Sequence, residues 1–235
     1  MDYLGTPMRV LVTNDDGFDA PGIRALREAA EQLGEVVVVA PSSQRSECGH
    51  STTTGRTIRV REVDGVHTVD GTPADCVRVA LVAMDLGRFD FVLSGVNSGG
   101  NLGVDRFMSG TIAAARESVL LGVPSVAVSH YLMREREVDW DGVTRWTRQV
   151  LEELFEKPAR DGHFWNVNYP HPPSYDEMPE IRYCCPSNLP LAVAFEAVGD
   201  GFRYSGKYRD RGAEPGSDVE ACFGGSIAVT ELSIG

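Results

Sequence analysis

The chain has 235 residues, of which 42% are hydrophobic and 24% are charged. This length and balance fit one large soluble globular domain, or a domain with an appended subdomain, that buries a substantial core. The formal net charge of −12 argues against a nucleic-acid polymer or an anionic membrane as partner, because both repel an acidic protein that lacks a local basic patch. A small anion held through a metal ion is compatible with this charge.

The sequence carries no sign of membrane insertion or secretion. It has no run of about 18 apolar residues, and its first residues lack the basic start and apolar centre of a signal peptide. We therefore expect a cytoplasmic protein whose five cysteines, which lack CxxC spacing, are reduced thiols. Cys48, in a polar loop, is the candidate for a reactive thiol.

The N-terminal part of the sequence predicts a strand, a helix and a second strand. Residues 10–12 are an apolar run typical of a buried strand, and residues 21–33 repeat apolar side chains at helical spacing. Residues 36–40 form an uninterrupted apolar run, as expected for a parallel strand covered on both faces. After a polar loop, residues 56–69 alternate as expected for a hairpin or for edge strands, with the turn at Asp64-Gly65.

The middle of the sequence repeats this alternation. Thr72 and Pro73 cap a helix predicted from Ala74 to about Leu86 and closed by Gly87. The next predicted elements are a buried strand over residues 89–93, a loop with four glycines over residues 94–103, an Ala-rich helix from Ser109 to Gly122, and a strand over residues 125–129.

An amphipathic helix is predicted over residues 140–156 and a short strand over residues 164–167. Repeated strand-helix alternation with apolar strands indicates an α/β fold with a doubly wound, mostly parallel sheet. We assign residues 1–185 to this catalytic core. Its histidines His50 and His130 follow predicted strands and could line a pocket there, but a polar surface role is the simpler expectation for both.

The last part of the chain, residues 186–235, has a different composition. Glycines interrupt aromatic and charged residues, and no helical pattern is convincing there. We expect a β-rich extension with protruding hairpins that serve oligomerisation, followed by a strand near residues 226–232 that returns to the core.

Polar side chains follow three of the predicted core strands. Asp15 and Asp16 follow the first strand, Ser46 lies in the loop after the second, and Asn97 follows the strand at residues 89–93. Each of these residues alone is most simply a turn residue. Because ligands bind at the carboxyl ends of parallel strands, their shared position favours a functional site.

The chemistry of this residue set points to a hard divalent cation. Two adjacent carboxylates repel each other, and Mg²⁺ or Mn²⁺ prefers carboxylate, hydroxyl and amide oxygens. The helix start at residues 109–111 adds a feature for phosphate, because exposed N–H groups and the helix dipole favour an anion.

Five segments together resemble the SurE family of survival proteins and nucleotidases. They are VTNDDGFDAPGI at 12–23, VVAPSSQRS at 38–46, GTPADCV at 71–77, VLSGVNSGGNLG at 92–103 and SGTIAAA at 109–115. Weaker similarity continues through WNVNYP at 165–170 and GGSIAVTEL at 224–232. In order and spacing the resemblance covers nearly the whole chain.

This resemblance implies a metal-dependent phosphomonoesterase that hydrolyses nucleoside 5′- and 3′-monophosphates, in some members also short polyphosphate. It also implies a Rossmann-like core whose protruding C-terminal region exchanges between subunits, giving a homodimer or homotetramer. By motif position, the ligands of one divalent metal ion per subunit are Asp15, Asp16, Ser46 and Asn97. The residues around the phosphate are Asn14, Asn101, Ser109, Gly110 and Thr111.

The sequence departs from the family pattern at several places. Glu47, Cys48 and Gly49 follow Arg45-Ser46 where the family usually has Gly next, so Glu47 adds a carboxylate near the metal. Gly100 stands where the family typically has Pro, and the chain ends at Gly235, soon after its last strand. Because every metal-ligand position is kept, we expect catalysis to be intact. The departures therefore bear on substrate specificity and on assembly.

Our primary hypothesis is in-line attack on phosphorus by a water molecule that the metal activates. Asp15 and Asn101 are the catalytic candidates, with Asn101 and the helix start stabilising the transition state. The alternatives are a phosphatase for a non-nucleotide metabolite on the same scaffold, or a non-catalytic, receiver-like metal-binding module. An aspartyl-phosphate route is disfavoured because the two carboxylates are adjacent rather than spaced as DxD.

Overall fold

The computed structural model describes residues 8–46, 48–133 and 136–235. Its strands are β1 (Arg9–Thr13), β2 (Glu35–Pro41), β3 (Val60–Val63), β4 (Val66–Val69), β5 (Phe91–Ser98), β6 (Ser125–His130), β7 (His163–Tyr169), β8 (Ile181–Tyr183), β9 (Phe195–Val198), β10 (Gly201–Tyr204) and β11 (Ile227–Ser233). Its α-helices are α1 (Pro21–Glu31), α2 (Pro73–Arg78), α3 (Gly110–Leu120), α4 (Trp140–Glu156) and α5 (Asp218–Phe223).

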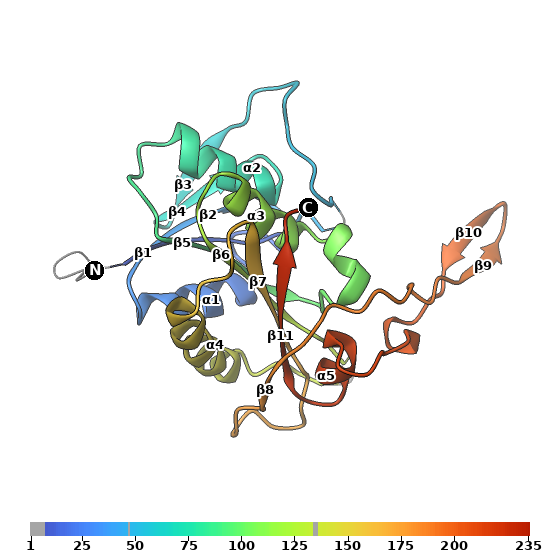
Figure 1. Ribbon diagram of the computed structural model, residues 1–235. Helices are drawn as coiled ribbons and strands as arrows, with labels where there is room; N and C mark the ends of the chain where they lie inside the picture. Colours follow the sequence, from blue (N-terminus) through green and yellow to red (C-terminus); the bar gives the residue numbers. More distant parts are fainter. Residues whose placement is uncertain (1–7, 47, 134–135) are drawn as a thin grey trace.

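One large sheet with strand order β3-β4-β2-β1-β5-β6-β7-β11-β8 forms the centre of the protein (Figure 1). Strands β4, β2, β1, β5, β6 and β7 run parallel, while β3 and β11 pair antiparallel to β4 and β7. The prediction of an α/β fold with a doubly wound, mostly parallel sheet is confirmed. From β1 the sheet extends in one direction through β2 and in the opposite direction through β5. In such sheets, ligands bind at the carboxyl ends of the strands where the strand order reverses in this way.

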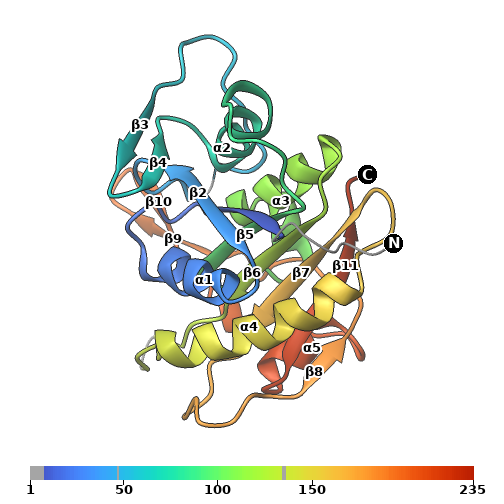
Figure 2. The same cartoon turned by 90° about the vertical axis from the view of Figure 1, so that its left-hand side faces the viewer.

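Helices cover both faces of the sheet (Figures 1 and 2). Helices α1 and α4 pack together on one face, where Leu26, Val143 and Trp146 belong to the same buried cluster as Val10 and Val12 of β1. On the other face α2 and α3 pack together over Leu11 and Val92. Because β1 is buried on both faces, its end is held rigidly, and the loop that follows it is fixed at the sheet edge.

Strand β5 is longer and begins later than predicted. It runs to Ser98 rather than stopping at residue 93, and its pairing with β6 shifts register between Ser94 and Asn97. Gly95, with φ of +140°, makes this bulge possible, and a Cβ there would collide with the carbonyl oxygen of Val128. The glycines that suggested a loop instead allow the strand to continue. Asn97 therefore lies on a strand.

Two helix predictions need correction. Helix α2 ends at Arg78 and passes into a π-helical turn over Val79–Ala83, so the helix does not reach Leu86. Helix α5 lies in the region where no helix was expected; it is only six residues long, too short for a periodic pattern, and is capped by Ser217, whose hydroxyl accepts the Glu220 N–H. The predicted turn at Asp64-Gly65 is confirmed, with both residues at positive φ.

The C-terminal region returns to the sheet and also projects from it. Strand β11 inserts between β7 and β8, while the β9–β10 hairpin extends away from the body of the protein (Figure 1). The expected protruding hairpin is thereby confirmed. The division of the chain at residue 185 remains a prediction. In the described ranges, no helix is long and apolar enough to cross a membrane.

Candidate active site

The loop after β1 is a tight turn built by Asn14 and Gly17. The Asn14 amide donates to the Gly17 carbonyl at 2.8 Å and its side-chain oxygen accepts the Gly17 N–H at 3.2 Å. Asn14 therefore shapes the loop with both ends of its amide. Contact between Asn14 and a phosphate remains a prediction.

Asp15 is directed from this turn toward the start of α3. Its carboxylate accepts a hydrogen bond of 2.6 Å from the Thr111 hydroxyl, and a Cβ on Gly110 would lie 3.0 Å from the Asp15 Cβ. Asp15 is only 5% exposed, and this burial, with a further contribution from the Asp16 charge, raises its pKa to about 6. Hydrogen bonds from Thr111 act in the opposite direction, lowering the pKa.

Asp16 is directed toward a different element. Its carboxylate accepts the backbone N–H of Ser98 at 2.8 Å, which links the β1 loop to the end of β5. The neighbouring Asn97 donates its amide N–H to the Gly99 carbonyl at 2.7 Å, so the Asn97 side-chain oxygen is the atom left for a ligand. The structure thus brings Asp15, Asp16 and Asn97 to one edge of the sheet.

The loop after β2 approaches the same edge through its backbone. The Arg45 N–H donates to the Asp15 carbonyl at 2.7 Å, while the adjacent Ser46 is exposed and its hydroxyl accepts from Gln44 at 2.8 Å. Arg45 is thus held beside Asp15, whereas the role of Ser46 as a metal ligand remains a prediction. Glu47, expected to add a carboxylate, lies outside the described residues.

The Cys48 thiol lies next to Gly110. Burial raises the pKa of this thiol, which argues against the expected reactivity of Cys48.

Asn101 is anchored by strands that the sequence did not connect with the site. Its N–H donates to the Asn168 side chain at 2.7 Å, its amide donates to the Ser129 hydroxyl at 2.8 Å, and its carbonyl accepts from Asn166 and Asn168. These polar side chains are buried in the otherwise apolar strands β6 and β7. Buried polar residues within apolar strands were the available signal, since such groups need partners.

The start of α3 is organised by its own cap and by the preceding turn. The Ser109 hydroxyl accepts the Ile112 N–H at 3.1 Å, and the Ser109 N–H donates to the Asp105 carbonyl at 3.0 Å.

Farther along α3, the buried Glu117 carboxylate binds both Arg78 and His50 at 2.6 Å. His50 therefore anchors the loop over α3.

His130 is not on the polar surface as expected. It is fully buried, with its ring nitrogens 2.8 Å from the Tyr175 hydroxyl and 2.7 Å from the Tyr131 carbonyl. Burial lowers the pKa of His130 to about 4, so the ring is a neutral packing and hydrogen-bonding group.

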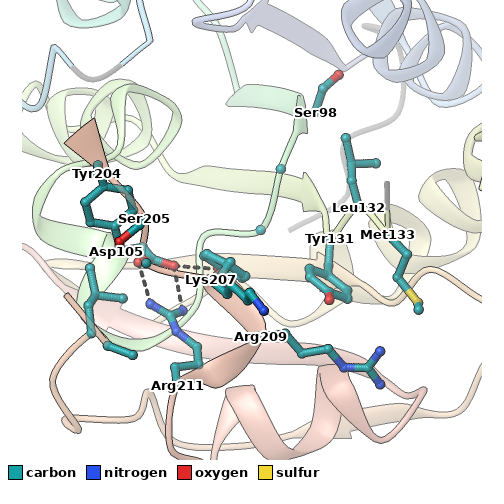
Figure 3. Close-up of a pocket in the computed structure, with 16 residues that line it drawn as sticks. Ser98, Asp105, Tyr131, Leu132, Met133, Tyr204, Ser205, Lys207, Arg209 and Arg211 are labelled. Carbon is teal, nitrogen blue, oxygen red and sulfur yellow. Dashed lines mark hydrogen bonds and ion pairs between the residues drawn. The ribbon is translucent and has the colours of Figure 1, made fainter. Parts of the chain in front are cut away.

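A large cavity adjoins the carboxylate loop. It has a volume of about 1090 Å³ and opens beside Ser98, Gly99 and Gly100, which follow Asn97 directly. Figure 3 shows its other walls, formed by the segment after β6 that begins at Tyr131 and by the segment after β10. The site therefore combines a carboxylate edge with space for a larger ligand.

The residues at the edge fit a hard divalent cation. In the described part of the chain no three or more His, Cys, Asp or Glu side chains gather as a metal site, so the donors are two carboxylates together with hydroxyl and amide oxygens. This donor set is the one Mg²⁺ or Mn²⁺ prefers. A cation would also favour the ionised form of Asp15, which burial and Asp16 oppose.

Fold and site together define an α/β protein with a strand-end acidic site beside a helix N-terminus. Residues 10–189 match the family model described as survival protein SurE. The chain therefore belongs to the SurE family.

Relatives of known name and structure agree with this membership. The chain is 47% identical to the 5′-nucleotidase SurE of Desulforudis audaxviator, over 97% of this chain and 92% of that protein. It is 38% identical to the 5′-nucleotidase SurE of Paramagnetospirillum magneticum, over 96% and 89%. The crystal structure of the SurE protein from Aquifex aeolicus superposes with a TM-score of 0.86 at 32% identity, covering 97% of this chain and 94% of that one.

Proposed function

We propose that this protein is a metal-dependent 5′-nucleotidase, a phosphoric monoester hydrolase that acts on nucleoside 5′-monophosphates and also 3′-monophosphates. The observation that carries the proposal is the meeting of Asp15, Asp16 and Asn97 at the ends of β1 and β5, against the start of α3. The names of the relatives supply the substrate class, since they specify 5′-nucleotidase.

The reaction converts the phosphate ester and water into a nucleoside and inorganic phosphate. The oxygen of water forms a bond to phosphorus, the ester bond between phosphorus and the sugar oxygen breaks, and the sugar oxygen takes up a proton. One Mg²⁺ or Mn²⁺ per subunit, held by Asp15, Asp16, Ser46 and Asn97, would neutralise phosphoryl charge and lower the pKa of water.

The residues of the chain bind and orient the phosphoryl group. Ser109, Gly110 and Thr111 begin α3, where the helix dipole favours an anion. Gly110 also lets the backbone approach Asp15 closely. Asn101, fixed through Ser129 and Asn168, is the proposed donor to the transition state. Because its partners hold it in place, little reorganisation is needed during reaction.

The nucleoside would lie in the cavity beside Ser98 to Gly100. Tyr131, Leu132 and Met133 give this cavity an apolar wall, which suits a ring system, whereas the phosphoryl group stays at the carboxylate edge. A non-nucleotide phosphatase and a receiver-like binding module gain no support from the relatives. Cytoplasmic location and a homodimer or homotetramer complete the proposal.

Metal removal tests the proposal. Purified protein with Mg²⁺ or Mn²⁺ is expected to release phosphate from adenosine 5′-monophosphate and from p-nitrophenyl phosphate. Excess EDTA is expected to abolish release, and added metal to restore it. Hydrolysis that persists unchanged in EDTA would refute metal dependence, whereas hydrolysis of sugar phosphates but no nucleotide would favour the metabolite phosphatase.

A further inference from the structure

The cavity beside Ser98 has a positively charged lining in an acidic protein. Its charged lining residues are Asp105, Lys207, Arg209 and Arg211, whereas the whole chain carries a formal net charge of −12. Arg211 donates two hydrogen bonds to the Asp105 carboxylate, at 2.8 Å and 2.7 Å. These two charges cancel, so Lys207 and Arg209 leave the lining with an excess of positive charge.

Lys207 and Arg209 are free to meet a ligand. In the described ranges, neither side chain forms an ion pair or a hydrogen bond, in contrast to neighbouring Arg203 and Arg211, which pair with Glu196 and Asp105. Figure 3 shows Lys207 and Arg209 on the segment that also carries Arg211. Unpaired cations lining a cavity are suited to an anionic group.

The wall that carries these cations has a fixed position. Tyr208, between them in sequence, donates a hydrogen bond of 2.6 Å to Asp105, and its ring lies 4.3 Å from the Arg211 guanidinium carbon. A Cβ on Gly100 would lie 2.8 Å from the Tyr208 hydroxyl oxygen, so the glycine-rich loop and this wall are closely packed. The two cations are therefore presented from an ordered wall of the cavity.

The cavity and the carboxylate edge share one residue, Ser98. Ser98 both lines the cavity and donates its N–H to Asp16 at 2.8 Å. The lining also includes Gly99 and Gly100, the apolar wall that begins at Tyr131, and the two cations. These groups suit a molecule that places one phosphoryl group at the carboxylates, a ring against the apolar wall and a second anionic group at the cations.

We propose that the cavity binds a leaving group that itself carries a second phosphoryl group, with Lys207 and Arg209 as the residues that bind it. The inference rests on the proposed nucleotidase function and extends its substrate class to nucleoside bisphosphates. It assigns to the C-terminal segment a part in substrate selection.

The test compares adenosine 5′-monophosphate with adenosine 3′,5′-bisphosphate as substrates at constant ionic strength. For the wild-type protein, kcat/KM for the bisphosphate is expected to be about tenfold higher, the gain that charge-assisted contacts provide. In Lys207→Ala/Arg209→Ala this preference is expected to disappear, while kcat/KM for the monophosphate changes by less than about twofold. Equal values for both substrates in the wild type, or a preference that survives the double variant, would overturn the proposal.

A matched control removes the same charges elsewhere. Arg148→Ala/Lys157→Ala deletes one arginine and one lysine from α4, where they pair with Glu152 and Glu153 at 2.9 Å. This control is expected to keep the bisphosphate preference. If the control also lost the bisphosphate preference, that preference would come from the overall charge of the protein. This result would contradict a specific binding site at Lys207 and Arg209.

A second variant pair approaches the cavity from the opposite segment, so the test does not depend on the C-terminal segment folding normally. Met133→Glu places a carboxylate in the lining, and Met133→Gln places a neutral side chain of the same size. The glutamate variant alone is expected to lose the bisphosphate preference. Identical behaviour of the two variants would count against the proposal.

Calorimetry separates this inference from the proposed activity. Adenosine 3′,5′-bisphosphate is expected to bind the wild-type protein about tenfold more tightly than Lys207→Ala/Arg209→Ala, whether or not it is hydrolysed. Nucleotide hydrolysis with equal binding to both proteins would overturn the cavity assignment alone. Inorganic phosphate added to the monophosphate assay is a further probe. If it changes hydrolysis by the wild type but not by the double variant, Lys207 and Arg209 bind free phosphate, and the proposal is overturned.

Discussion

Two adjacent carboxylates in the β1 loop contact different parts of the molecule. Asp15 is buried against Thr111 at the start of α3, while Asp16 accepts a hydrogen bond from Ser98 at the end of β5. The sequence shows that the two carboxylates are adjacent. It does not predict that Asp15 is buried and Asp16 half-exposed, because this difference depends on their contacts with α3 and β5. The same holds for Asn101, whose partners Asn166 and Asn168 lie far along the chain.

At the residue scale, His130 gives the stability of the fold a pH dependence. Burial lowers the pKa of His130 from 6.5 to about 4, so the unfolded chain takes up a proton first as the pH falls. Unfolding free energy is therefore expected to decrease between pH 6.5 and 4, by an amount on the order of 3 kcal/mol from this residue.

Urea unfolding across this pH range checks the expectation in the wild type and in His130→Asn, which removes the titrating ring. The variant is expected to lose less stability than the wild type as the pH falls. His163→Asn, at the start of β7, is the matched substitution at another histidine. A slope unchanged in His130→Asn would contradict the assignment.

At the element scale, the strands of the core were the most predictable features. Apolar runs identify β1, β2, β6 and β7 because strands buried on both faces need apolar side chains throughout. The C-terminal elements were less predictable, since α5 and β8 are short and are stabilised by distant contacts. For example, Asp218 at the start of α5 accepts the N–H groups of Gly103 and Ser187.

The contact between Asp105 and Arg211 is expected to secure the C-terminal segment to the turn before α3. Arg211 is 8% exposed and is held by both carboxylate oxygens of Asp105. Arg211→Ala leaves Asp105 buried without its ion-pair partner and is expected to cost about 3–5 kcal/mol of unfolding free energy. Arg203→Ala, which breaks an exposed pair with Glu196 at 3.8 Å, is expected to cost at most about 1 kcal/mol.

Denaturant unfolding monitored by circular dichroism measures both variants. Equal effects for Arg211→Ala and Arg203→Ala would show that the buried pair does not hold the segment in place. The Asp105 carbonyl also accepts the Ser109 N–H, so a loosened turn is expected to weaken the phosphate-binding helix start as well.

At the scale of the whole molecule, the β9–β10 hairpin exposes apolar side chains away from the core. Phe195 is 59% exposed and Phe202 80% exposed, which is unusual for large apolar residues on a projecting element. These side chains are the candidate contact between subunits. The sequence predicted a projecting hairpin from its glycines and aromatics, but its direction depends on the whole C-terminal path.

Phe195→Ser/Phe202→Ser is expected to lower the mass in solution from a dimer or tetramer to a monomer, because the apolar contact is lost. Light scattering coupled to size exclusion measures this mass. Val82→Ser, which replaces a 71% exposed apolar residue after α2, is the control and is expected to keep the wild-type mass. A double variant with wild-type mass would exclude the hairpin as the subunit contact.

Phosphate release from adenosine 5′-monophosphate by Asp15→Asn in the presence of Mn²⁺ tests the proposed metal site most directly. The wild-type protein and Asp19→Asn, an exposed aspartate in the same loop, are expected to show equal metal-dependent turnover. Asp15→Asn keeps the size of the side chain but removes its charge, so its turnover is expected to fall by about a hundredfold or more. Turnover in Asp15→Asn equal to that of the wild type would contradict the assignment of this site.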